Sequence, residues 1–121
     1  MKLNEIEKYF QTNLFEMSNY SSKTTGLEGT TMWVRTEPGV LPHIKYRVKF
    51  QHPQKGSAVF AFWGEDIQQV AGNWKLTGKS LTKVKTLLQL IQGDIIKHID
   101  GKLDSTELGK RIESAREKKT S

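Results

Sequence analysis

The sequence predicts an α+β domain in which a long helix packs on an antiparallel sheet. Three observations indicate this fold: helical spacing of apolar residues toward both ends of the chain, alternation of apolar and polar residues in the middle, and turn-forming residues between the alternating segments. A chain of 121 residues has the size of one ordinary domain, so we expect residues 1–121 to form a single unit.

The first predicted element is an amphipathic helix over residues 1–17. Its apolar residues recur at steps of three and four, which places them on one helical face: Leu3, Ile6, Phe10, Leu14 and Met17. Residues 18–29 are rich in Ser, Thr, Asn and Gly, which favour local turns, so a loop is expected there.

A three- or four-stranded antiparallel sheet is predicted over residues 30–76. Residues 30–36 and 43–51 alternate between apolar and polar side chains and are separated by a turn containing Pro38 and Gly39, which predicts a hairpin. Residues 57–63 are apolar on both faces, as expected of a central strand. Residues 64–77 fit neither period, and one or two short strands are expected there.

Two helices are predicted to follow the sheet. Apolar residues recur with helical spacing over residues 80–100, with Ser80 in the position of an N-cap and Gly101 as the stop. A second, short helix is expected over residues 105–119, because Asp104 to Glu107 has the form of a capping box. Its end is strongly basic.

The strand over residues 43–51 carries the most suggestive functional pattern. Alternation places Tyr46, Val48 and Phe50 on one face and Lys45, Arg47 and Lys49 on the other. Successive cations on such a face lie about 7 Å apart, close to the phosphate spacing along a nucleic-acid strand. An equally weighted alternative is that these lysines protect an exposed sheet edge from pairing.

Other basic and aromatic residues extend the candidate surface. The run from Lys75 to Lys85 contains no acidic residue, and Lys79 and Lys83 would be neighbours on one helical face. An exposed tryptophan would offer a stacking platform for unpaired bases, although tryptophans more often fill the core. The residues predicted to contact nucleic acid are Lys45, Arg47, Lys49, Arg35, Lys75, Lys79, Lys83 and Trp33.

The composition indicates which partners and which cell compartment suit the chain. The net charge of +6 and the pI near 9.6 favour acidic partners, chiefly nucleic acid or an acidic protein surface. Cysteine is absent, which excludes disulfides and thiolate metal sites and fits a reducing cytoplasm. No apolar run suits a secretion signal or a membrane span. We expect neither metal nor cofactor, and the oligomeric state stays open, a homodimer included.

Motifs for catalysis are incomplete. Residues 71–80 resemble a phosphate-binding loop, but Asn73 stands where that loop requires its first glycine. Residues 96–107 resemble a calcium loop, but Ile96 and His98 occupy the positions of its first two oxygen ligands. The three histidines lack metal-ligand spacing. No catalytic residue is predicted, and a small hydrolase ranks a distant third among the functions considered.

One resemblance covers residues 24–112. The chain carries Thr25-Gly26-Leu27, Trp33-Val34, Gly39, His43 and Arg47-Val48-Lys49, followed by a long helix closing at Gly101. This succession resembles an uncharacterised family of small bacterial proteins, which implies a single domain and no assigned activity. The order of strands followed by a helix is also similar to that of single-strand DNA-binding proteins of the transcriptional-coactivator type, as an analogy of topology.

The function predicted from the sequence is therefore non-enzymatic binding of single-stranded DNA or RNA through the basic strand face. The alternative is a protein-binding inhibitor or accessory factor, encoded by a phage or mobile element, that acts on a nucleic-acid-processing complex.

Overall fold

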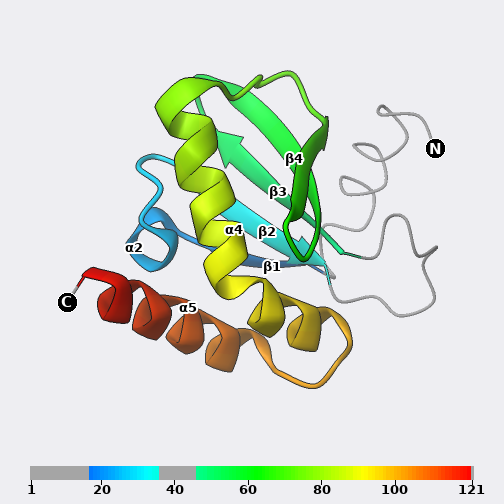
Figure 1. Cartoon of the computed structure of the whole chain (residues 1–121), viewed down its shortest axis with the longest axis vertical. Coiled ribbons are helices and arrows are strands. Elements are labelled where there is room, and N and C mark those ends of the chain that lie inside the picture. Colours follow the sequence, from blue (N-terminus) through cyan, green and yellow to red (C-terminus); the bar gives the residue numbers. More distant parts are fainter. Residues whose placement is uncertain (1–16, 36–45, 121) are drawn as a thin grey trace.

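A computed structural model describes residues 17–35 and 46–120. These residues form a five-stranded antiparallel sheet with one long helix across one of its faces and a second helix packed against the first (Figure 1). The predicted helix over residues 1–17 lies outside the described part of the chain except for Met17, which begins a strand instead.

The strands follow one another in space in the order of the chain. They are β1 (Met17–Tyr20), β2 (Thr31–Arg35), β3 (Arg47–His52), β4 (Gly56–Trp63) and β5 (Asp66–Ala71). The described residues thus form a sheet of five strands rather than three or four, because β1 lies outside residues 30–76, over which the sheet is predicted. The antiparallel arrangement itself agrees with the prediction.

The missed strand β1 and the irregular period of β5 each have a physical explanation, and β5 itself lies within residues 64–77, where one or two short strands are predicted. The segment forming β1 is short and polar, so Ser18 and Asn19 suggested a loop, yet Tyr20 pairs with Met32 of β2 and is buried. Strand β5 contains an irregularity opposite Val59 and Phe60, which shifts the register by one residue. A bulge of this kind breaks the period of two on which strand recognition depends.

Alternation along the central strands sends their apolar side chains into one core. Val34 pairs with Val48, and Val48 pairs with Phe60, so the three share the face that packs against the helices. Phe50 lies on the same face and meets Phe60 edge to face, with ring centroids 5.8 Å apart. All four are fully buried.

Three helices complete the described fold. Helix α2 (Ser22–Thr25) is a single turn inside the segment predicted to be a loop. Helix α4 (Gly78–Ile99) crosses in front of the sheet, and α5 (Ser105–Thr120) packs against α4 and α2 (Figure 1). The helix predicted from residue 80 begins two residues earlier, because Thr77 rather than Ser80 takes the extended N-cap conformation.

Helices α4 and α5 join the core through apolar stripes. The buried residues of α4 recur at helical spacing: Val84, Leu87, Leu88, Ile91, Ile95 and Ile99. Helix α5 adds Leu108 and Ile112, and the carboxylate of Asp104 caps it by accepting the backbone N–H of Glu107 at 2.8 Å. Because β4 and β5 form a hairpin, the start of α4 lies at the same end of the sheet as the β3–β4 turn.

Candidate functional site

The basic row of β3 is not an exposed surface. Arg47 and Lys49 are each 8% exposed, so the prediction that they face solvent is wrong. The register places Lys49 between Trp33 and Val59, and Arg47 beside Ala61, on the sheet face away from α4. Alternation correctly indicated which face these side chains share. It carries no information on whether that face is covered, and burial lowers the pKa of the Arg47 guanidinium.

The other strand residues predicted to contact nucleic acid do not form an exposed basic surface in the described structure. Lys45 lies outside the described residues. Arg35 ends β2, and only its backbone is described. Trp33 is partly buried and donates its indole N–H to the side-chain oxygen of Gln51 at 3.2 Å. Phosphate contact by the face formed by Arg47 and Lys49 is therefore disfavoured.

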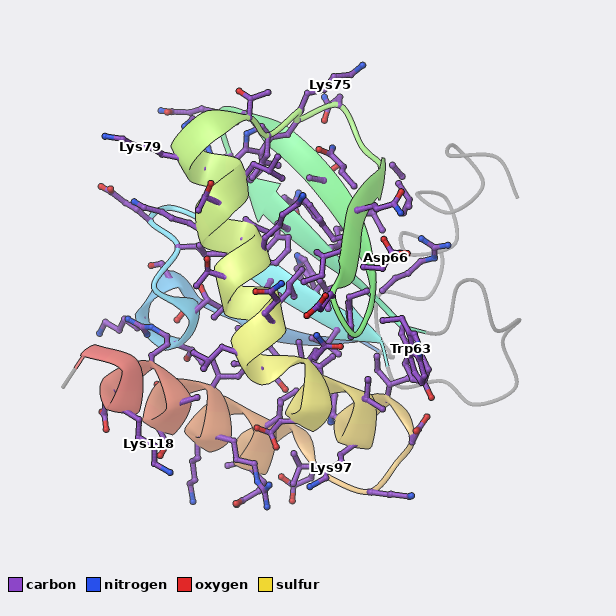
Figure 2. All side chains as sticks on the ribbon, viewed as in Figure 1. Trp63, Asp66, Lys75, Lys79, Lys97 and Lys118 are labelled. Atoms are coloured by element: carbon purple, nitrogen blue, oxygen red, sulfur yellow. The ribbon has the colours of Figure 1, made fainter. Side chains whose placement is uncertain are left out.

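The remaining predicted lysines lie at one end of the molecule. Lys75 precedes α4, and Lys79 and Lys83 lie on its first two turns, all exposed. Figure 2 shows Lys75 and Lys79 at the end opposite Lys97 and Lys118. The β3–β4 turn brings Lys55 to the same end. We call these four lysines, Lys55, Lys75, Lys79 and Lys83, the basic end.

A network of amide side chains holds the loop that carries Lys75. The side-chain oxygen of Asn73 accepts the backbone N–H of Ser57 at 3.0 Å, and the backbone N–H of Trp74 donates to the Ser57 carbonyl at 2.9 Å. Gln69 donates to the Trp74 carbonyl at 2.7 Å and accepts the N–H of Leu76 at 3.3 Å. These bonds tie residues 73–76 to β4 and β5, so the position of Trp74 is fixed by the sheet.

The β3–β4 turn is fixed in a similar way by His52. Its Nδ1 accepts the backbone N–H groups of Gln54 at 3.1 Å and Lys55 at 3.3 Å. The ring meets Trp74 edge to face, with centroids 5.6 Å apart. The ammonium of Lys55 lies 6.0 Å from the centroid of the Trp74 ring, within the range of a cation–π contact.

A groove of about 560 Å³ opens between these parts. Residues 26–30 form one wall, His52 and Lys55 form another, and Trp74 with the first turns of α4 forms the third. Among the described residues that line it, the charged ones are Lys55, Lys83 and Glu28. We call this the Trp74 groove, and its volume lies in the range of ordinary ligand sites.

The electrostatic setting of the basic end is positive. No acidic residue occurs between Asp66 and Asp94 in the sequence, and the first turn of α4 contains none. The N-terminus of a long helix adds partial positive charge from its free N–H groups. An anionic ligand is therefore favoured at the basic end.

The sequence alone missed His52, Lys55 and Trp74 as parts of this surface. Nothing local in the sequence connects Trp74 to the turn 52–55, which precedes it by about twenty residues. The hairpin β4–β5 makes the connection, because it returns the chain to the end where it started. A prediction of the β4–β5 hairpin would therefore have placed His52, Lys55 and Trp74 at the same end of the sheet.

An aromatic pair marks the opposite end of β4. Trp63 is 66% exposed and stacks on Tyr46 with ring centroids 5.4 Å apart. Beside the pair is a hollow of about 440 Å³ that includes Ala61 and Asp66. Nearby, Gln92 of α4 bonds both backbone groups of Gly64, at 2.9 and 2.6 Å.

Hydrogen bonds link the Ser18 hydroxyl to the His98 ring and the His98 ring to the Leu103 carbonyl. A nucleophile, its base and an orienting group would be linked in the same order. Nδ1 of buried His98 lies 2.7 Å from the Leu103 carbonyl, and Nε2 lies 3.3 Å from the Ser18 hydroxyl, which is 2.5 Å from that of Ser105. His98 is 3% exposed, and both of its ring nitrogens are within hydrogen-bond distance of protein groups. These hydrogen bonds join β1, α4 and the start of α5, so their role is structural.

Within residues 17–35 and 46–120, no cluster of three or more histidine or carboxylate side chains could hold a metal ion. None of the helices described in the structure is long and apolar enough to cross a membrane. Comparisons with models of protein families, with curated proteins and with solved structures find no match. The resemblance based on Thr25-Gly26-Leu27 and the later residues therefore stays a prediction.

Proposed function

We propose that this protein is a non-enzymatic, cytoplasmic binding protein that contacts DNA or RNA through the basic end. The observation that carries the proposal is that four exposed lysines from two separate segments lie at one end of the molecule, where Lys55 and Lys83 line the Trp74 groove. This moves the proposed contact surface from the β3 face to the loops at the start of α4.

The chemistry of the basic end suits a phosphate backbone. Lys75, Lys79 and Lys83 are exposed, so their ammonium groups remain hydrated and mobile until a polyanion approaches. Each phosphate neutralised releases condensed counterions, and this release is the main source of sequence-independent affinity. The hydrogen bonds of Asn73 and Gln69 fix the loop that carries Lys75, so this loop need not become ordered on binding.

A protein partner is the second candidate, supported by the aromatic pair Trp63 and Tyr46. A large exposed tryptophan beside an apolar hollow is typical of the centre of a protein interface. This keeps the predicted inhibitor or accessory factor as the alternative, with a surface distinct from the basic end.

The test replaces Lys75, Lys79 and Lys83 together with glutamine. The matched control replaces Lys97, Lys102 and Lys110, which are also exposed, and because each variant replaces three lysines, both lose the same net charge. Fluorescence anisotropy with short single-stranded and duplex oligonucleotides of DNA and RNA, across a salt series, measures the affinity. The basic-end variant should lose about two units from the slope of log affinity against log salt, at about 0.7 per single-strand phosphate contact.

The control should lose much less slope, because its charges lie at the other end of the molecule. Equal losses in the two variants would show that net charge alone drives binding and would contradict a defined surface. Wild-type protein that binds no oligonucleotide more tightly than about 100 μM would refute the proposal and favour a protein partner at Trp63.

A further inference from the structure

The Trp74 groove is concave and contains an aromatic ring, which distinguishes it from the exposed lysines of the basic end. Lysines on a convex surface suit any polyanion, duplex or single-stranded. A groove that presents an indole ring suits a flat aromatic ligand as well. We propose that the Trp74 groove takes one unpaired nucleobase, which makes the protein selective for single strands over duplexes.

The position of Trp74 fits a stacking platform. Its backbone is held on both sides, by Ser57 and by Gln69, so the ring is oriented before any ligand arrives. His52 braces it edge to face. The ring is partly buried, packs against the core and still lines the groove. A preoriented ring loses little entropy when a base stacks on it.

Lys55 occupies the place over the ring that a base would take. Its ammonium lies 6.0 Å from the ring centroid, and the side chain is exposed, so it is free to swing aside. The displaced ammonium remains near the rim, where the phosphate of a stacked nucleotide would lie. One residue thus covers the platform in the free protein and neutralises the backbone in the complex.

Glu28 sets the direction in which a nucleotide enters. Glu28 lines the groove and its negative charge repels phosphate, whereas Lys55 and Lys83 attract it. A nucleotide therefore enters base first, with its phosphate toward the lysines. In a duplex the base is paired and stacked within the helix, so it cannot enter without being unpaired.

This inference rests on the proposed function, and the experiment separates the two. The variant Trp33→Phe/Trp63→Phe leaves Trp74 as the single tryptophan of the chain. It is titrated with a labelled single-stranded oligonucleotide and with the matching duplex, while label anisotropy and Trp74 emission are followed in parallel. Single-strand binding should quench Trp74 along the anisotropy curve, and duplex binding should leave the emission nearly unchanged.

A second variant tests the energetic role of the ring. Trp74→Leu should weaken single-strand binding by about 5- to 100-fold and duplex binding little, as expected for the loss of one stacking contact. Trp74→Phe should retain most of the affinity. The control Trp63→Leu removes an exposed aromatic ring from the other end of β4 and should change neither affinity.

Two outcomes overturn the inference while the proposed function stands. One is single-strand binding by anisotropy with unchanged Trp74 emission. The other is an equal loss of single-strand and duplex affinity in Trp74→Leu. If no oligonucleotide binds the wild-type protein at all, both the inference and the proposed function fail. The fluorescence arm uses the native Trp74, so it holds even if Trp74→Leu does not fold.

Discussion

Replacement of Leu88 by alanine tests the packing of α4 on the sheet. Leu88 is fully buried in the centre of α4. The substitution removes three carbon groups, worth about 0.8 kcal/mol each in lost transfer free energy, or about 2.4 kcal/mol in total. The cavity left behind raises the expected cost to about 3 to 5 kcal/mol. This is a large part of the roughly 5 to 15 kcal/mol that stabilises a typical domain.

Leu90, two residues further along the same helix, provides the matched control. It is 39% exposed, so Leu90→Ala loses only part of the transfer term and opens no closed cavity. We expect a cost of at most about 1.5 kcal/mol. Urea denaturation followed by circular dichroism measures both variants, provided that the slope with denaturant is unchanged. Equal losses for Leu88→Ala and Leu90→Ala would refute the packing of α4 described above.

Two further predictions concern the loop and the alkaline limit of stability. Gly72 has a φ of +101°, and a Cβ there would collide with the backbone carbonyl of Ser57. Gly64 has a φ of +62°, but no atom lies within 4 Å of its Cβ position. Gly72→Ala should therefore lower the melting temperature clearly more than Gly64→Ala. Burial raises the pKa of Tyr20, whose hydroxyl donates to the Ser105 carbonyl at 3.1 Å, so the folded state holds the phenolic proton more tightly than the unfolded state. The free energy of unfolding should therefore fall as the pH rises above about 10, and Tyr20→Phe should make that fall shallower in denaturation curves collected between pH 8 and about 11. An identical pH profile in Tyr20→Phe would contradict the raised pKa.

Local patterns in the sequence predicted the parts of the fold that depend on neighbouring residues. Alternation identified Val48 and Phe50 as core residues, and helical spacing identified the apolar stripe that includes Leu88 and Ile95. Strand β1 was not predicted, because a segment of four mostly polar residues is too short to show the alternation of a strand. Its place in the sheet is set by pairing with β2, which is a tertiary interaction.

The candidate site was predictable only in part, for a related reason. Lys75, Lys79 and Lys83 are close in sequence, so their common surface could be predicted from the sequence. The exposure of Arg47 and Lys49 could not, because what covers a sheet face is decided by distant parts of the chain. The meeting of His52 with Trp74 likewise requires the path of the β4–β5 hairpin.

The most direct test of nucleic-acid binding at the basic end is a map of backbone amide shifts. Uniformly ¹⁵N-labelled protein is titrated with a short single-stranded oligonucleotide, and the amide signals are followed by heteronuclear NMR. If the oligonucleotide binds at the basic end, the largest shifts fall in residues 28–30, 52–56 and 73–84. Shifts centred on Trp63, Gly64 and Gln92, or no shifts at millimolar oligonucleotide, would contradict binding at the basic end.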